Sequence, residues 1–296
     1  MANAISPKCS SAFRAGRFAL PVPSPKEKTR SAQLIVVLCL VPLTIFSVAF
    51  LPLAIARLIL ASGEGEAGWA IYQQILQTPR YLISLIQTVL VSLAVTIAAL
   101  AVSTTAGLFL TRNRFRGRSV LLSILTLPLA FPGVVVGFMI ILLGGRQGLF
   151  NTVFPGQVVF AYSIFGLFLG YLYFSIPRVL LTVMAAAEKI DPAREEAART
   201  LGAPPHLVAR DLLFPALAPA LIAAGEIAFA TAMGVFGTAF TLATNIDVLP
   251  MVIYTEFTSS ANIAMAAALS VMLGMVTRAI LFVARSFTGA TVVAGG

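Results

Sequence analysis

Long stretches without charged residues constrain the fold of this chain more than any other feature. Five of them contain no Asp, Glu, Lys or Arg: residues 34–53, 81–110, 120–145, 147–177 and 257–277. A sixth, residues 212–245, contains a single charge, Glu226. About 20 apolar residues in a helix cross the roughly 30 Å hydrocarbon core of a bilayer, because each adds about 1.5 Å. The pattern therefore predicts an all-α membrane protein with six transmembrane helices.

The basic residues indicate how these helices are oriented. The chain has 20 Lys and Arg residues against 11 Asp and Glu. With the N-terminus inside and six crossings, 17 of the 20 fall on the inner side, and only Arg57, Arg80 and Arg146 fall outside. Cytoplasmic loops carry such an excess of Lys and Arg. Both termini are therefore expected to be cytoplasmic. The basicity reflects topology, and no nucleic acid is expected as a partner.

These spans divide the chain into four expected parts. Residues 1–33 form an uncleaved cytoplasmic tail, and residues 34–80 form the first transmembrane helix and an outer loop. The loop suits a helix at the membrane surface, with Trp69 and Tyr72 at the interface between lipid and water. Residues 81–285 form the core, and residues 286–296 form a cytoplasmic C-terminal tail. In the third span, Pro128 and Pro132 remove backbone donors and predict a break within the membrane.

Groups that carry out chemistry are scarce in this sequence. It contains no phosphate-binding loop of the form GxxxxGK[ST] and no His/Cys cluster, and its single histidine is His206. Catalysis needs positioned acids, bases, nucleophiles or metals. We therefore expect a protein that is not itself an enzyme and that holds no cofactor or metal.

One polar stretch, residues 191–215, interrupts the apolar pattern. Asp191 and Pro192 suit the start of a helix, because an Asp side chain accepts from free amides and Pro fits the first helical position. Glu195 and Glu196 then complement the helix dipole. Gly202 suits a positive-φ end, Pro204 and Pro205 open a second short helix, and Pro215 closes the segment. This predicts a helical hairpin at the inner surface that docks a partner; the alternative is a surface loop without one.

The sequence "EAARTLGAPPHLVARDLLFP" within this stretch resembles the EAA loop of the membrane-spanning subunits of type I ATP-binding-cassette importers. The matching positions are Glu196, Ala197, Ala198, Gly202, Leu212, Phe214 and Pro215. Leu212 and Phe214 replace the usual isoleucine and leucine, and both keep the apolar character. The proline-glycine stretch of the third span and the fifth-span region are also similar, so the resemblance covers roughly residues 81–285.

The resemblance implies a division of labour between subunits. Two such permeases, identical or paralogous, face each other in the bacterial inner membrane and receive substrate from a periplasmic substrate-binding protein. A dimer of cytoplasmic ATP-binding subunits binds ATP-Mg, and each subunit binds a short coupling helix from one loop. In this chain the coupling helix is expected to carry His206 and Arg210. The residues implied in ATPase docking are Glu195, Glu196, Ala197, Ala198, Gly202, His206, Arg210 and Pro215.

Glu226 is the charge expected deep inside a span, and two roles are open for it. It either has a structural role, as an ion pair with Arg178 or Arg278 near the inner ends of the fourth and sixth spans or as a protonated hydrogen-bonding group, or it passes a cationic substrate; the remaining alternative is neither role. Phe236 and Gly237 are the other candidates for the translocation path. The resemblance slightly favours a polyamine-like cation as substrate, with ferric iron, phosphonate and thiosulfate or sulfate as further candidates. The competing interpretation is a self-contained proton-coupled transporter or channel, which usually has two related halves that this sequence does not show.

Overall fold

The structure is a computed structural model that describes residues 25–65, 68–154, 159–242 and 246–293. Most of the N-terminal tail expected over residues 1–33 therefore lies outside the described residues. The chain divides into two compact units, Met1–Ala56 and Arg57–Gly296. The first described helix, α1 (Pro25–Gly63), begins at Pro25, so residues 25–33 of the expected tail are helical, and the part of α1 that is apolar enough to cross a membrane is Leu40–Gly63.

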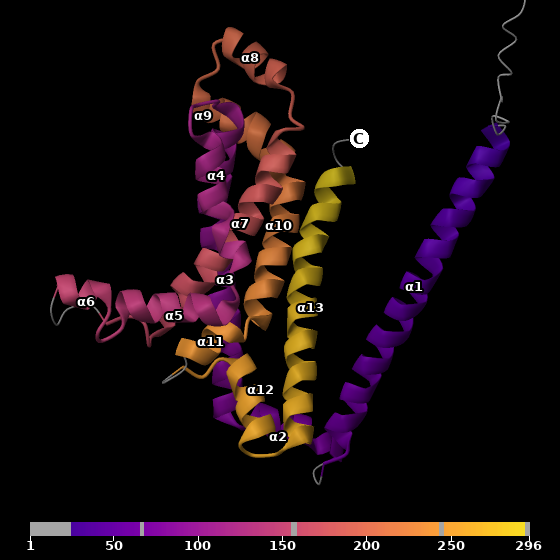
Figure 1. Cartoon of the computed structure of the whole chain (residues 1–296), viewed down its shortest axis with the longest axis vertical. Helices are drawn as coiled ribbons and strands as arrows, with labels where there is room; N and C mark the ends of the chain where they lie inside the picture. Colours follow the sequence, from indigo (N-terminus) through magenta and orange to yellow (C-terminus); the bar gives the residue numbers. More distant parts are fainter. Residues whose placement is uncertain (1–24, 66–67, 155–158, 243–245, 294–296) are drawn as a thin grey trace, which may run out of the picture. The chain divides into compact units, whose positions relative to one another are not determined.

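The second unit is a bundle of long helices joined by short ones (Figure 1). Its long helices are α3 (Pro79–Arg112), α7 (Ile164–Ala187), α10 (Phe214–Gly234) and α13 (Ile263–Val293). The shorter elements are η1 (Gly68–Ala70), α2 (Ile71–Gln77), α4 (Arg118–Thr126), η2 (Leu127–Ala130), α5 (Gly133–Gly144), α6 (Leu149–Val153), α8 (Pro192–Thr200), α9 (Pro205–Leu207), η3 (Val208–Leu213), α11 (Gly237–Leu242) and α12 (Leu249–Thr258).

Six helical segments in the described residues are long and apolar enough to cross a membrane. They are Leu40–Gly63, Pro79–Arg112, Gly133–Val153, Ile164–Ala187, Pro205–Gly234 and Ile263–Ser286. The predicted fold class and the number of spans are confirmed. Several boundaries differ, and α13 in particular continues to Val293, so most of the expected C-terminal tail is helical.

The third predicted span, residues 120–145, is not one continuous helix. It is divided into α4, the 3₁₀ turn η2 and α5, and Phe131 and Pro132 between them have extended backbone. Pro128 and Pro132 cannot donate backbone hydrogen bonds, which ends the α-helical pattern at this point. After the break, α5 and α6 run away from the bundle, almost across the direction of α4 (Figure 1). The expected break is present, but it changes the course of the chain.

Small residues bring the central helices together. Ala99 of α3, Val179 and Val183 of α7, and Ala224 and Ala228 of α10 form one buried cluster. Their short side chains let the backbones approach closely, as in other membrane helices.

A second close crossing joins α5 to α11. A Cβ added at Gly237 would lie 3.0 Å from the backbone nitrogen of Val134. The Thr238 hydroxyl donates to the Gly133 carbonyl over 3.0 Å. A Cβ added at Gly133 would likewise lie 3.2 Å from the Thr238 hydroxyl oxygen, so both glycines allow this close crossing.

The segment after α1 packs with the core of the second unit. Ile71 and Ile75 of α2 are buried with Leu249 and Val252 of α12 and Leu269 of α13. The short helix expected in the outer loop is thus present as α2. The second compact unit begins at Arg57, because the apolar side of α2 is covered by α12 and α13.

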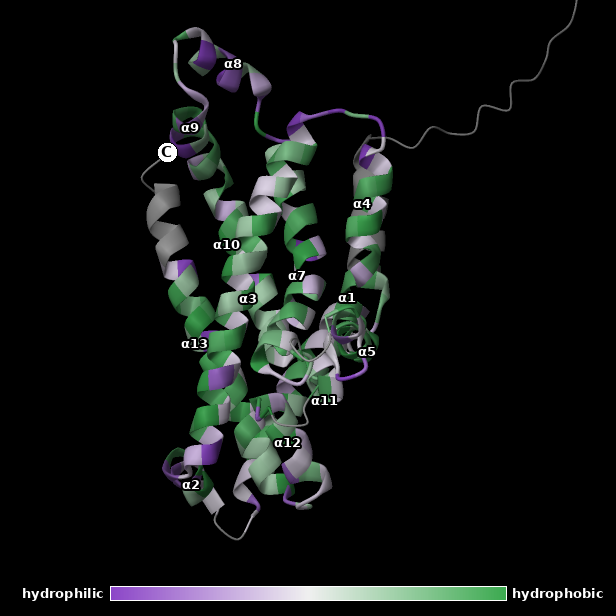
Figure 2. Ribbon diagram, turned by 90° about the vertical axis from the view of Figure 1, so that its left-hand side faces the viewer, coloured by the Kyte–Doolittle hydropathy of each residue, from purple (hydrophilic) through white to green (hydrophobic). Residues whose placement is uncertain are grey.

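The polar hairpin lies at one end of the bundle. Helices α8 and α9 lie at one end, and α2 and α12 lie at the other (Figure 1). Hydrophilic residues gather on α8 and on the loop before α4, whereas the long helices are mostly hydrophobic (Figure 2). The polar stretch of residues 191–215 therefore projects from one end of the apolar bundle.

Candidate functional site

Helix α8 is bounded at both ends by local hydrogen bonds. At its start, the Ala193 amide donates to the Asp191 carboxylate over 3.0 Å, and Pro192 occupies the first turn. At its end, Gly202 has a φ of +84°. The Gly202 and Ala203 amides donate to the carbonyls of Arg199 and Ala198 over 2.9 and 3.1 Å. These two hydrogen bonds together form the Schellman motif. The helix start at Asp191 and the elbow at Gly202 are both as predicted.

An ion pair holds α8 against the bundle. Arg112, in the last turn of α3, pairs with Glu195, and both Nη atoms of Arg112 also donate to the Ile190 carbonyl over 3.4 Å. Glu195 is only 7% exposed. It therefore faces the bundle, whereas sequence reasoning had placed it with the partner-contacting residues. The sequence did not predict that Arg112 pairs with Glu195. Its only indication was the position of Arg112 in the basic loop "TRNRFRGRS", residues 111–119.

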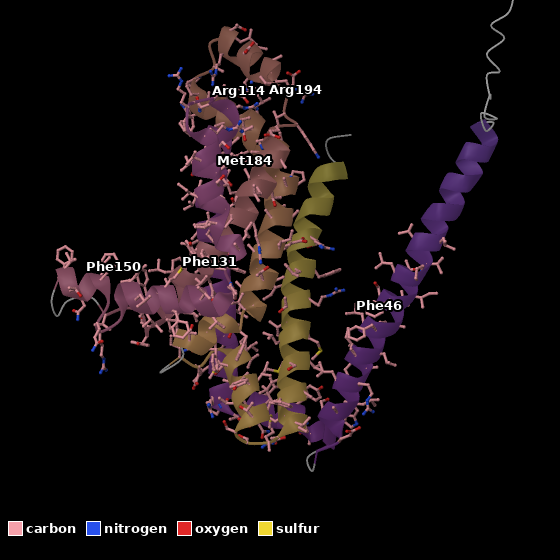
Figure 3. All side chains as sticks on the ribbon, viewed as in Figure 1. Phe46, Arg114, Phe131, Phe150, Met184 and Arg194 are labelled. Atoms are coloured by element: carbon pink, nitrogen blue, oxygen red, sulfur yellow. The ribbon has the colours of Figure 1, made fainter. Side chains whose placement is uncertain are left out.

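The other side of α8 faces away from the bundle. Glu196 and Ala197 are exposed, and Ala198 is partly exposed. Leu201, at the end of α8, is 88% exposed, which is unusual for a leucine. Arg194 of α8 and Arg114 of the preceding basic loop lie at this same end (Figure 3). The free surface thus combines charged residues with one protruding apolar side chain.

The expected second short helix is not separate. The helix starting at Pro205 continues through Pro215 into α10, so that Pro205–Gly234 forms one span. The turn η3 before Pro215 is π-helical, which accommodates a residue that has no amide to donate. His206 and Arg210 are exposed near the start of this long helix. The isolated short helix of the hairpin is therefore α8, and the expectation that Pro215 closes the segment is wrong.

Glu226 pairs with a residue that was not considered. Its carboxylate accepts from Nε of Arg285 on α13 over 2.9 Å, and Nη2 of Arg285 lies at the same distance. The Glu226 side chain is 12% exposed and that of Arg285 is 72% exposed. The expected partners Arg178 and Arg278 lie well inside α7 and α13, because both helices extend beyond the predicted spans.

Phe236 and Gly237 lie beyond the end of α10 and contact other elements than Glu226 does. The Phe236 ring lies 5.3 Å from that of Phe240 and 5.1 Å from that of Tyr254 on α12. Gly237 packs against the start of α5. The three translocation candidates therefore do not form one cluster around Glu226.

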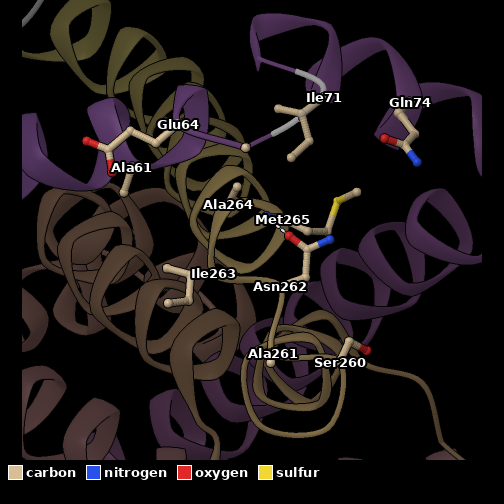
Figure 4. A pocket seen from close by; sticks show the side chains of 11 residues that line it. Ala61, Glu64, Ile71, Gln74, Ser260, Ala261, Asn262, Ile263, Ala264 and Met265 are labelled. Carbon is tan, nitrogen blue, oxygen red and sulfur yellow. Dashed lines mark hydrogen bonds between the residues drawn. The ribbon is translucent and has the colours of Figure 1, made fainter.

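A polar cavity of about 620 Å³ opens at the end of the bundle opposite α8 (Figure 4). Glu64, Gln74 and Asn262 contribute polar groups to its wall. The Asn262 side chain accepts from the Met265 amide over 3.0 Å, and Ala261 beside it has a φ of +49°. Within the described residues, no group of three or more His, Cys, Asp or Glu side chains is placed to hold a metal ion.

Six apolar helices with a polar, capped hairpin at one end define a multi-pass membrane permease subunit. The chain belongs to the family of binding-protein-dependent transport system inner membrane components, whose family model matches residues 103–290. It is thus a permease subunit of an ATP-binding-cassette importer for a small solute.

Relatives of known name agree with this family. The molybdenum transport system permease protein ModB of Escherichia coli is 35% identical over 179 residues, which is 57% of this chain and 78% of ModB. The sulfate transport system permease protein CysT of Salmonella typhimurium is 33% identical over 184 residues, covering 61% of this chain and 66% of CysT. The putative 2-aminoethylphosphonate transport system permease protein PhnU of the same species is 28% identical over 246 residues. The match covers 80% of this chain and 85% of PhnU.

The fold also matches a solved structure. A chain of a bacterial ABC transporter that imports the acidic polysaccharide alginate superposes with a TM-score of 0.72. The match covers 90% of this chain and 99% of that one at 18% identity, and so it supports the fold alone.

Proposed function

We propose that this permease couples ATP hydrolysis by a cytoplasmic partner to import, and that α8 is the element on which the partner docks. The observation that carries the proposal is the hairpin itself. It is a short, capped helix held by an ion pair between Arg112 and the buried Glu195, and it presents Glu196 and Leu201 on its free side. An element that transmits movement must be both exposed to the partner and firmly attached to the spans.

The attachment of α8 supports this role. Arg112 joins the end of α3 to Glu195 of α8 and to the Ile190 carbonyl just beyond α7. Movement of α8 is thus passed to two of the central helices. Glu196 suits a polar contact with the ATPase, and Leu201 suits an apolar pocket at the centre of such an interface, where buried apolar anchors contribute most.

The remaining partners follow from the same proposal. A second permease subunit, identical or paralogous, completes the translocation path, and the α8 end faces the cytoplasm together with both termini. A substrate-binding protein docks at the opposite end. The alginate transporter, which shares the fold, was solved in complex with a periplasmic protein carrying an alginate pentasaccharide. A self-contained proton-coupled carrier is not favoured, because the chain belongs to a family named for its dependence on binding proteins.

For the substrate we propose a small oxyanion, and not the polyamine-like cation that the sequence slightly favoured. The named relatives carry molybdenum, sulfate and 2-aminoethylphosphonate. Glu226, the residue that suggested a cation, is neutralised by Arg285. Without a free carboxylate, the main reason to expect a cationic substrate is removed.

The test is purification of the intact complex from native membranes, followed by reconstitution into vesicles. Mass spectrometry is expected to identify an ATP-binding subunit and a second permease subunit. ATP-dependent uptake is expected for molybdate, sulfate or a phosphonate, but not for putrescine. Uptake of putrescine alone would overturn the oxyanion assignment and leave the importer assignment in place.

The docking role is tested in the same preparation with Glu196→Lys. This variant is expected to reach the membrane at normal levels but to lose the ATPase subunit or its stimulation by the loaded binding protein. Glu64→Lys, a charge reversal at the opposite end, is the matched control and is expected to retain the ATPase. Full transport by Glu196→Lys would show that α8 is not the docking element.

A further inference from the structure

A groove between α7 and α10 remains open on the surface of the bundle. Its volume is about 740 Å³, and it lies near the α8 end. Its walls include Thr182, Ala185 and Lys189 from the α7 side and Ala216, Pro219 and Ala220 from α10. Helix α3 packs on these two helices through the buried Ala99–Val179–Ala224 cluster, so the groove is on a different side of the pair.

The lining of this groove differs from a surface made for lipid. Helix α13 exposes Met275, Phe282 and Val283, with Phe282 exposed by 75%. Such large apolar side chains suit contact with acyl chains. The groove is instead lined mainly by alanine and proline, with Leu181 and Ile190 as its large apolar residues, and it also carries Thr182 and Lys189. Small walls leave room for water or a solute, and a cation is costly next to hydrocarbon.

Arg178 lies one helical turn beyond Thr182, deeper along α7. The Thr182 hydroxyl donates to the Arg178 carbonyl over 2.9 Å, so the two residues share one side of the helix. Arg178 is nine residues before the end of α7 at Ala187, which places it about 14 Å into the span at 1.5 Å per residue. Its guanidinium donates to the Thr231 hydroxyl of α10 over 3.1 Å and lies 4.3 Å from the centre of the Phe174 ring.

Arg178 has no acidic partner in the part of the chain that the structure describes. None of the ion pairs among the described residues, which include Arg112–Glu195 and Arg285–Glu226, involves Arg178. A guanidinium has five N–H donors, and the bond to Thr231 uses one of them. The half-buried Arg178 guanidinium lies inside a span, with the Phe174 ring on one side and free N–H donors. Its burial costs free energy unless an anion binds to it.

We propose that Arg178, with Thr231 and Phe174, is a contact site for the permeating oxyanion, and that the groove lined by Lys189 and Thr182, one helical turn from Arg178, is its cytoplasmic exit route. Arginine presents a planar fork that matches the oxygens of a tetrahedral anion. Phe174 and Thr231 hold that fork in position. Lys189 in the groove adds a second positive charge, which draws the anion along it. This assignment rests on the oxyanion substrate proposed above.

The first test is transport by the reconstituted complex. Arg178→Gln is expected to lower oxyanion uptake by about tenfold or more, the effect of losing one charge-assisted hydrogen bond. ATPase stimulation by the binding protein is expected to remain, because Arg178 is far from α8. Arg178→Lys keeps the charge and is expected to retain part of the uptake. Arg278→Gln, in α13, is the matched control and is expected to transport normally. Normal uptake by Arg178→Gln would overturn the proposal.

The second test does not depend on which solute is carried. In a background with Cys9 and Cys39 replaced, Thr182→Cys is modified with anionic and with cationic methanethiosulfonates. The anionic reagent is expected to react faster, and the added change Arg178→Gln is expected to abolish that preference. Phe282→Cys on α13 is the control and is expected to be unreactive. An unreactive Thr182→Cys, or equal rates with both reagents, would refute the anion site.

Together the two tests separate this site from the proposed function. If the complex carries no oxyanion but the anionic preference at position 182 depends on Arg178, the substrate assignment fails and the anion site stands. If oxyanions are carried but Arg178→Gln has no effect on uptake or on the preference, the site fails and the function stands. Should Arg178→Gln not assemble, Arg178→Lys and Thr231→Val measure the same dependence.

Discussion

Gly202 shows how a single backbone conformation shapes the docking element. Its φ of +84° closes the Schellman motif of α8 and turns the chain back toward the bundle. An added Cβ at Gly202 would meet nothing within 4 Å. The cost of a side chain here is therefore conformational and not steric. A β-branched residue in this left-handed region costs about 1–2 kcal/mol or more.

A graded series at this position separates conformation from contact. Asn tolerates the left-handed region better than Ala, and Ala better than Val. The measured quantity is the ATPase activity stimulated by the loaded binding protein. We expect this activity to be nearly normal in Gly202→Asn, reduced in Gly202→Ala and mostly lost in Gly202→Val. All three are expected to insert at normal levels, because the spans pack without the hairpin. Membrane abundance is the control, and equal coupling in all three variants would contradict the elbow's role.

At the scale of elements, two ion pairs join helices that are distant in sequence. Arg112 and Glu195 attach α8 to α3, and Glu226 and Arg285 attach α10 to α13. Because α10 continues directly from the helix that starts at Pro205, it links the hairpin to the α13 side of the bundle. The Glu226–Arg285 ion pair therefore suits a structural role, in which it connects the fifth and sixth spans.

The structural role of the Glu226–Arg285 ion pair can be tested by removing and by exchanging the two charges. Glu226→Gln and Arg285→Gln are each expected to lower the stability of the complex by about 1–2 kcal/mol, since each leaves one charge without its hydrogen-bonded partner. The double exchange Glu226→Arg with Arg285→Glu is expected to restore part of that loss. Thermal unfolding in detergent measures the effect. Loss of transport with unchanged stability would instead assign Glu226 to the translocation path.

For the whole molecule, the distribution of charge agrees with one orientation in the membrane. The basic loop before α4 and the charged helix α8 share one end of the bundle. Arg80 and Asp247 form an exposed pair, 3.6 Å apart, outside that hairpin region. Positive charge is retained on the cytoplasmic side, so the α8 end is expected to face the ATPase.

Single cysteines test this orientation in intact cells and in inverted vesicles. Gln77 at the end of α2 and Thr200 at the end of α8 are both exposed. With Cys9 and Cys39 replaced, Gln77→Cys is expected to react with an impermeant thiol reagent only from outside, and Thr200→Cys only from inside. Labelling of Thr200→Cys from outside would reverse the assigned topology.

The sequence by itself determined the class of fold, the number of spans and the ends of α8. Those features depend on local properties: apolar length, the cap at Asp191, and the freedom of Gly202 to adopt positive φ. Such properties are visible in a short window of residues, because the forces that produce them act within a few turns of one helix.

The tertiary structure decided which residues meet. Sequence reasoning did not find Arg112 as the partner of Glu195 or Arg285 as the partner of Glu226, and it gave Pro215 as an end where the helix continues. It also placed Arg178 near the end of a span, whereas that residue lies inside α7 beside Thr231. Ion pairs between helices depend on the rotation and register of each helix in the bundle. Those are set by packing at small residues such as Ala99 and Ala224, which a single apolar stretch does not reveal.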